Sequence, residues 1–297
     1  MIKNGGFPNN VFKKLFDSCV CSVTDYGGEV WGFKSYESNR QIMLRAARAF
    51  LGLPKQTPIP GILSELNWSE PRSRTQIQMV RHFHRMLKMD DSRLTKKGFR
   101  WDKSLNDSQN IYTWSSEVND ILNRNNIGHV FQQNHFSLPL VLNNLRTSLL
   151  NRDKISWQSQ CRQLPKLRTF IKFKDFTCDS PHTYKPLSFF QRKLMSKFRL
   201  GMLHLRIETG RFIRLLPEER LCLVCNGGEV EDETHFLLRC NKYSQNRQKL
   251  FGEIPDLDNF ISLNDQDKLK LLLNDPTLVK KTSKFIADSF EYRSTII

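Results

Sequence analysis

The sequence predicts a mainly α-helical protein. Apolar residues recur three or four positions apart along several stretches of the chain, which is the period of an amphipathic helix. Glycine or proline follows several of these stretches, where a helix would have to end. Apolar residues make up 39% of the 297 residues and phenylalanine alone contributes 21, so the chain can build a packed core. Charged residues make up 26%, close to the globular average, which argues against global disorder.

The first part of the chain is expected to form three helices. Residues 1–10 are rich in Gly, Asn and Pro and are interpreted as a loose leader. An apolar stripe from Phe12 to Val23 predicts the first helix, which Gly27 and Gly28 would end. The second and third helices are expected at about 36–51 and 72–89. Residues 90–115 are polar and are interpreted as a linker.

The second part is also expected to be helical, although less regularly. Helical patterns cover 116–124 and 138–155, whereas 166–184 is mixed and is compatible with a short strand or an irregular stretch. A longer helix is predicted from residue 186 on, with an apolar stripe formed by Phe190, Leu194, Phe198 and Leu205. Two short helices, 266–273 and 278–290, are expected in the tail.

The charge of the chain favours a polyanionic partner. Lys and Arg number 46 against 30 Asp and Glu, which gives a net charge of +16. A field of this sign attracts nucleic acid first and an anionic membrane surface second. No run approaches 18 apolar residues, so no membrane-spanning helix is predicted. The N-terminus shows no apolar signal region and the seven cysteines are unevenly spread, so an intracellular location is expected, in the nucleus or the cytoplasm.

Two groups of basic residues are candidates for contact with phosphates. The first group lies 7, 4 and 3 residues apart on the third helix and consists of Arg74, Arg81, Arg85 and Lys88. The second group recurs every seven residues and consists of Arg192, Arg199 and Arg206. Residues seven apart drift by only about 20° per step, so the second group would form one stripe. The alternative for both groups is a solvated face, and for the second also pairing with the acidic residues 229–233.

The strongest motif is a set of four metal-ligating residues near the C-terminus. It consists of Cys222, Cys225, His235 and Cys240. Zinc accepts thiolate and imidazole ligands in a tetrahedral array, and a structural site uses four of them. A segment of this size has little core of its own, so ligation is expected to supply on the order of 10 kcal/mol of its folding energy. The alternative is a set of buried cysteines with a surface histidine.

Catalytic motifs are not evident. Asp90-Asp91 follows a basic helix and is interpreted as a helix-end turn rather than a metal-binding pair. Pro255-Asp256 lacks the downstream carboxylate and lysine of an endonuclease-like motif, and no phosphate loop of the GxxxxGK type occurs. The remaining cysteines, Cys19, Cys21, Cys161 and Cys178, are expected to be core or surface thiols. The chain is therefore not expected to be an enzyme.

Several segments resemble non-LTR (LINE-like) retrotransposon reverse transcriptases. Tyr26-Gly27-Gly28-Glu29-Val30-Trp31-Gly32 and the basic helix that ends at Leu51-Gly52-Leu53-Pro54-Lys55 resemble the region just after the polymerase palm. The region before the zinc knuckle of that family is similar to Lys197-Phe198-Arg199-Leu200-Gly201, Ile207-Glu208-Thr209-Gly210-Arg211, Glu219-Arg220-Leu221-Cys222 and Glu231-Asp232-Glu233-Thr234-His235-Phe236. The likeness covers roughly residues 11–250.

The resemblance implies a helical thumb-like bundle, a helical linker and a small CCHC zinc knuckle that together grip RNA or DNA. The aromatic-x-Asp-Asp motif of the palm is absent, so polymerase activity is not implied. The expected regions are a leader (1–10), a basic thumb-like region with linker (11–115), a helical region (116–215), the knuckle (216–250) and a helical tail (251–297). The alternative function is a helical module that docks a polymerase, such as that of the parent element, or a ribonucleoprotein.

Overall fold

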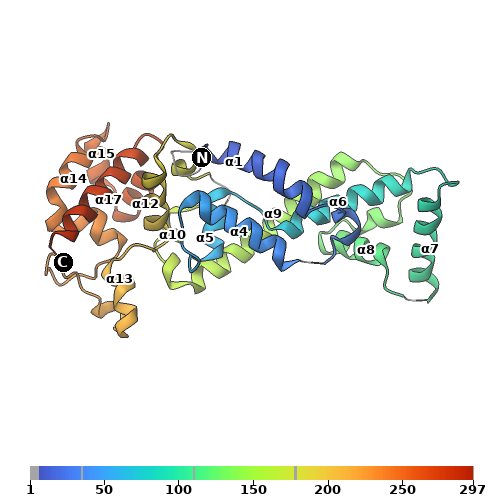
Figure 1. Ribbon diagram of the computed structural model, residues 1–297, viewed down its shortest axis with the longest axis horizontal. Coiled ribbons are helices and arrows are strands. Elements are labelled where there is room, and N and C mark those ends of the chain that lie inside the picture. Colours follow the sequence, from blue (N-terminus) through green and yellow to red (C-terminus); the bar gives the residue numbers. More distant parts are fainter. Residues whose placement is uncertain (1–6, 35, 110, 177–178, 297) are drawn as a thin grey trace. The chain divides into compact units, whose positions relative to one another are not determined.

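A computed structural model describes residues 7–34, 36–109, 111–176 and 179–296. Helices joined by turns and loops make up these residues, and no named strand occurs among them, so the predicted mainly α fold is confirmed (Figure 1). The chain divides into two compact units that are not contiguous in sequence. Unit 1 contains the described residues of 1–14, 43–68 and 157–297, and unit 2 contains those of 15–42 and 69–156.

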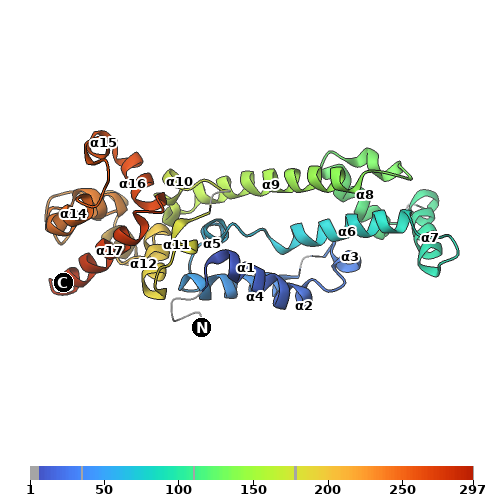
Figure 2. The same cartoon turned by 90° about the horizontal axis from the view of Figure 1, so that it is seen from above.

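Unit 2 is built around α6 (Pro71–Leu87). The helix α6 packs against α3 (Gly28–Trp31), α7 (Leu94–Gln109) and α8 (Trp114–Arg124) (Figure 2). The helix α9 (Leu138–Gln163) also begins in this unit. The remaining elements of unit 2 are η2 (Asp17–Cys21), α2 (Ser22–Thr24), η3 (Gly128–Gln132) and the start of α4 (Glu37–Leu51). The core of this unit contains Met79, Val80, Phe83, Phe99, Val118, Ile121, Leu122, Phe131 and Leu145.

The predicted linker at 90–115 is wrong, because α7 occupies most of it. Phe99 is buried in the core of unit 2 and its ring contacts that of Phe83. The Lys96 ammonium donates to the carbonyl oxygens of Met86 and Leu87, at 2.8 and 2.9 Å. A cation in this position stabilises the C-terminus of α6, whose last carbonyls have no partner inside the helix. The segment is polar because only one side of α7 touches the core.

Unit 1 collects helices from both ends of the chain. The helix α17 (Val279–Ser294) packs against α12 (Phe189–Arg199), α14 (Ser244–Phe251) and α16 (Asp265–Asn274) (Figure 2). The other elements of unit 1 are α1 (Asn9–Phe16, to residue 14), the end of α4, α5 (Ile59–Leu66), the end of α9, η4 (Pro165–Leu167), α10 (Phe170–Phe173), α11 (Pro181–Tyr184), α13 (Arg206–Thr209), η5 (Gly210–Ile213), η6 (Pro217–Glu219), η7 (His235–Arg239), η8 (Asn241–Tyr243) and α15 (Leu257–Ser262). No helix of the described chain is long and apolar enough to cross a membrane.

Three sequence predictions about unit 1 need correction. The predicted leader contains the start of α1, and the Asn9 side chain donates to the carbonyl oxygen of Leu66 at 2.9 Å. The described part of 166–184 contains short helices and no strand. The helix predicted from residue 186 ends at Arg199, because Gly201 takes a φ of 61°, which a glycine adopts without strain.

The two faces of α12 differ from the prediction. Arg192 and Arg199 are only 2% and 1% exposed, whereas Phe190 of the predicted apolar stripe is 61% exposed. Arg206 lies on a different helix, α13. The predicted stripe of Arg192, Arg199 and Arg206 is therefore wrong. Its two α12 members point into unit 1, so neither is placed to contact a phosphate.

Arg199 is buried because every part of its guanidinium group has a partner. Its Nε lies 3.0 and 3.1 Å from the two carboxylate oxygens of Glu65. Its Nη1 donates to the carbonyl oxygen of Leu273 at 2.7 Å and to Asn274 Oδ1 at 3.1 Å. The group also lies over the ring of Phe173, 4.8 Å from its centre. This contact set binds α5, α10 and the end of α16 to α12.

The protonation of Glu65 and His182 follows from the same arrangement. Burial alone would raise the pKa of Glu65, but Arg199 lowers that pKa below its ordinary value, so the carboxylate stays charged. Burial lowers the pKa of His182 to about 3, so its imidazole is neutral. The Nε2 atom of His182 lies 3.1 Å from Glu65 Oε2 and 3.1 Å from Ser196 Oγ. The charged pair is thus accompanied by the neutral imidazole of His182 and by the buried Lys174, which also lowers the pKa of Glu65.

Arg192 is buried by a second, smaller set of contacts. Its Nε donates to the carbonyl oxygen of Phe50 at 3.0 Å, and its guanidinium carbon lies 4.3 Å from the centre of the Phe50 ring. Burial lowers the pKa of this guanidinium, which still remains charged at neutral pH. Arg192 therefore fastens α12 to the end of α4.

We expect Arg199→Met to lower the free energy of unfolding by about 3–5 kcal/mol, because it leaves the Glu65 carboxylate buried without its partner. Replacing both residues, as Glu65→Leu with Arg199→Met, should recover much of the loss. Chemical denaturation of the full chain measures both values. Arg81→Met is the control, because Arg81 is exposed and its loss should change stability by less than about 0.5 kcal/mol. An Arg199→Met protein as stable as the wild type would contradict the buried pair.

Candidate metal centre

The four predicted ligand residues come together in unit 1. The Sγ atoms of Cys222, Cys225 and Cys240 and a ring nitrogen of His235 all lie within 4.8 Å of one another. Cys222, His235 and Cys240 are buried, and Cys225 is partly exposed. The structure thus shows a group of three thiols and one imidazole that can hold a metal ion.

A short paired stretch positions Cys222 and Cys225. Leu221 and Val230 form an isolated antiparallel bridge, and the Cys222 amide donates to the carbonyl oxygen of Glu229 at 2.9 Å. The chain then turns back, with φ values of 54° at Asn226 and 72° at Gly228. The Gly227 amide donates to Cys225 Sγ at 3.4 Å. The turn therefore directs a backbone dipole at the sulfur, as thiolate ligands require.

A wide helical turn positions His235 and Cys240. The Cys240 amide donates to the carbonyl oxygen of His235 at 2.7 Å, which closes a π-type turn over the four residues between them. The carboxylate of Asp232 accepts from the His235 amide at 2.7 Å and fixes the start of this turn. Arg247 donates to the carbonyl oxygen of Cys240 at 2.7 Å. Both ligands on this arm are thus held by backbone hydrogen bonds.

Glu229 orients the imidazole. Its Oε2 lies 2.9 Å from His235 Nδ1, and His235 Nε2 lies 3.4 Å from Cys225 Sγ. A carboxylate on one ring nitrogen fixes the tautomer and directs the other nitrogen at the metal position. The sequence did not single out Glu229 for this role, because its contact with His235 depends on the turn at 226–228.

The ligand groups compete with one another for protons. A hydrogen bond to Cys240 raises the pKa of Cys222 to about 12 and lowers the pKa of Cys240. A hydrogen bond with Cys222 raises the pKa of His235 to about 9. A metal ion binds the deprotonated thiolates and the neutral imidazole, so its binding releases protons.

The cluster shares its core with the surrounding helices. The ring of Phe236, next to His235, lies 5.9 Å from that of Phe198 on α12 and 5.7 Å from that of Phe285 on α17. It also lies 4.9 Å from the ring of Tyr243. The expected small knuckle without a core of its own is therefore not what the structure contains. His235, Phe236, Leu237, Cys240 and Tyr243 are buried in the interior of unit 1.

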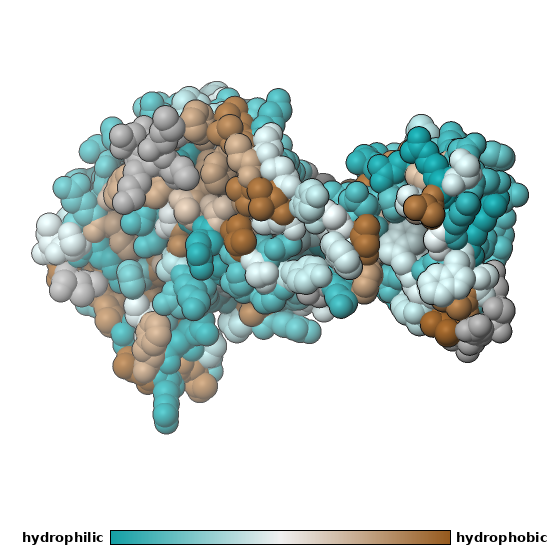
Figure 3. Space-filling view, turned by 45° about the vertical axis from the view of Figure 1, so that its right-hand side comes forward, coloured by the Kyte–Doolittle hydropathy of each residue, from teal (hydrophilic) through white to brown (hydrophobic). Residues whose placement is uncertain are grey.

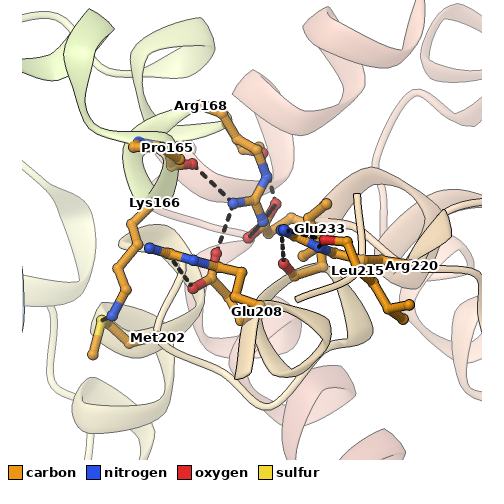
Figure 4. Close-up of polar contacts among 11 residues, drawn as sticks. Pro165, Lys166, Arg168, Met202, Glu208, Leu215, Arg220 and Glu233 are labelled. Carbon is orange, nitrogen blue, oxygen red and sulfur yellow. Dashed lines mark hydrogen bonds and ion pairs between the residues drawn. The ribbon is translucent and has the colours of Figure 1, made fainter. Parts of the chain in front are cut away.

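Two acidic residues between the ligands, Glu231 and Glu233, form buried ion pairs. Glu231 pairs with Arg293 of α17 and accepts from the Arg206 amide at 2.7 Å. Glu233 accepts from Arg168 Nη2 at 2.8 Å, and Arg168 also reaches Glu208 at 2.8 Å (Figure 4). The sequence suggested Arg192, Arg199 and Arg206 as partners of this loop. The structure pairs the loop with Arg293 and Arg168 instead, and Arg206 contributes only its backbone amide.

Two of the four basic residues predicted to contact phosphates from α6 lie beside acidic partners. Arg74 forms an ion pair with the buried carboxylate of Asp25 at 2.8 Å, so its expected role as a phosphate contact is not supported. Arg85 lies 4.0 Å from Glu29. Both acidic partners come from α2–α3 rather than from α6 itself, which is why i+3 and i+4 spacing did not reveal them. Arg81 and Lys88 are exposed.

Other candidate residues have local structural roles. Asp90 accepts from the Ser92 amide at 2.9 Å in a turn, and Asp256 caps α15 by accepting from the Asn259 amide at 3.2 Å. Burial raises the pKa of Cys21 to about 11 and that of Cys161 to about 12, so both are poor nucleophiles. Cys19 is exposed, and Cys178 lies outside the described residues.

No protein-family model matches the sequence, and comparisons with curated proteins and with solved structures found no match either.

We expect Glu229→Gln to weaken zinc binding by about 10- to 100-fold, because the variant loses the carboxylate that orients His235. Competition with a chromophoric chelator measures the affinity. Glu253→Gln is a matched control, since Glu253 is similarly exposed and pairs with Lys281 instead. Equal zinc affinity in both variants would argue against the orienting role of Glu229.

Proposed function

We propose that this chain is a non-catalytic, nucleic-acid-binding protein with one structural zinc ion. The convergence of the ligand atoms of Cys222, Cys225, His235 and Cys240 within 4.8 Å supports the zinc site. Three thiolates favour zinc over magnesium or calcium, which prefer oxygen ligands. Four protein ligands leave no open position for a substrate, so the ion would be structural.

The charge distribution supports nucleic acid as the partner. Unit 1 carries 30 Lys and Arg residues against 18 Asp and Glu residues, which is a net +12 of the +16 of the whole chain. Several acidic residues of this unit, such as Glu65, Glu231 and Glu233, are buried in ion pairs. Their charges are neutralised internally. The basic residues that remain at the surface would therefore dominate the field that a partner meets.

We further infer that the chain corresponds to the thumb-to-knuckle region of a non-LTR retrotransposon reverse transcriptase. The resemblance of 26–32, 51–55, 197–201, 207–211, 219–222 and 231–236 to that family supports this inference. The palm motif is absent from the sequence, so the chain would contribute grip on RNA or DNA rather than polymerisation. The partner polymerase would be that of the parent element. This assignment places the protein inside the cell, in the nucleus or the cytoplasm.

Zinc should copurify with the full chain at about one ion per molecule. Cys222→Ser should reduce that content strongly, because a structural site needs all four ligands. Elemental analysis of the purified proteins gives the ratio. Cys161→Ser is the matched control, since Cys161 is a buried thiol outside the cluster and should leave the zinc content unchanged. A wild-type protein without zinc, whose melting curve a chelator does not change, would refute the site.

Binding of single-stranded RNA should weaken steeply with salt, because phosphate contacts release counterions. The double variant Arg81→Gln with Lys88→Gln should lower the log–log salt slope by about 1.4, from 0.7 per phosphate. Fluorescence anisotropy at several salt concentrations measures this slope. Arg124→Gln is the control, because Arg124 already pairs with Asp120. Binding to a polymerase or ribonucleoprotein without RNA affinity would instead favour a protein-docking module.

A further inference from the structure

A projecting segment of unit 1 exposes large apolar side chains beside arginines. This segment, residues 211–216, is called the tip and follows α13 in Figure 1. Phe212 is 86% exposed, and Ile213 and Leu216 are 58% and 57% exposed. Arg211 and Arg214 are exposed as well. The projection at the lower left of Figure 3 accordingly shows hydrophobic and hydrophilic side chains next to each other.

The backbone of the tip is fixed by its base. Arg220 donates to the carbonyl oxygen of Leu215 from Nε at 3.1 Å and from Nη2 at 2.8 Å, and to that of Ile207 from Nη1 at 2.8 Å (Figure 4). Arg214 adopts a φ of 58°, an uncommon conformation for a residue other than glycine. A segment held this way loses little conformational freedom when it binds. The exposed ring of Phe212 is therefore held by a fixed backbone at the surface of unit 1.

The charges at the tip favour an anionic partner. Glu208 is occupied by Arg168 at 2.8 Å and Arg211 at 3.2 Å. The Glu219 carboxylate turns back and accepts from the Leu216 amide at 2.8 Å. Arg214 forms no ion pair within the described part of the chain. The outward face of the tip thus combines a bare aromatic ring with the guanidinium of Arg214, whereas Arg211 shares Glu208 with Arg168 and the exposed Glu218 follows the tip.

We propose that the tip binds single-stranded nucleic acid, with a base stacked on Phe212 and a neighbouring phosphate on Arg214. Every base offers a flat π face, and stacking on an aromatic side chain with cations beside it is a common mode of single-strand binding. This inference rests on the proposed nucleic-acid-binding function and assigns a site to it. The site replaces the predicted stripe of Arg192, Arg199 and Arg206, whose two members on α12 are buried.

The test uses the full chain and a fluorescein-labelled 20-nucleotide poly(U) probe, with anisotropy as the readout. Phe212→Ala should raise Kd by about 5- to 100-fold, the range for loss of one stacked base, and should leave the salt slope unchanged. Phe212→Trp should restore affinity. Arg214→Gln should lower the salt slope by about 0.7, the value for one phosphate contact.

Tyr26→Ala is the matched control, because Tyr26 is 87% exposed on unit 2 and has no arginine beside it in the sequence. It should bind the probe like the wild type. Equal affinity of Phe212→Ala and the wild type would overturn the tip site while leaving the proposed function intact. A wild-type chain that does not bind the probe would overturn both. Binding of anionic lipid vesicles or self-association that depends on Phe212, without an effect on poly(U) affinity, would also overturn the tip site.

Discussion

The buried ion pair between Arg199 and Glu65 holds unit 1 together. Its partners lie 134 residues apart in sequence, and the same guanidinium reaches the end of α16 through Leu273. Removing two charges from water is unfavourable, so such a pair persists only where further hydrogen bonds complete it. The neutral His182 and the Phe173 ring fill the remaining space around the charges. The pair therefore contributes little net free energy of folding, and its main effect is to determine which helices pack together.

The position of the Cys/His cluster depends on the arrangement of helices around Arg199. Arg199 and Arg192 set the inward face of α12, and Phe198 on that face contacts Phe236 beside the ligand His235. Two of the four ligands thus belong to a turn that the core already supports, whereas Cys222 and Cys225 lie on a short paired stretch. In the proposed zinc site, the metal would mainly fasten this second arm to a preformed first arm. Metal binding and core packing would then be coupled.

The acidic loop between the two pairs of ligands connects the cluster with the rest of unit 1. Glu231 pairs with Arg293 of α17, and Glu233 pairs with Arg168, which also binds Glu208 at the base of the tip. These buried carboxylates neutralise arginines that would otherwise be repelled by their basic surroundings. The same contacts leave the basic charge of unit 1 on its surface. One set of internal ion pairs therefore links the loop of the cluster to α17 and to the base of the tip.

The sequence by itself determined the features that depend on neighbours along the chain. Helical spacing indicated the longer helices except α5, α7 and α14. The short separations of Cys222, Cys225, His235 and Cys240 indicated the cluster, because turns of a few residues decide whether such atoms meet. Tertiary structure alone decided the environment of each arginine. Spacing placed Arg199 with Arg192 on one helical face but could not show that Glu65 faces it, and it could not show Asp25 beside Arg74. A charge is buried or exposed according to whether a distant carboxylate reaches it, and that depends on the packing of helices far apart in sequence.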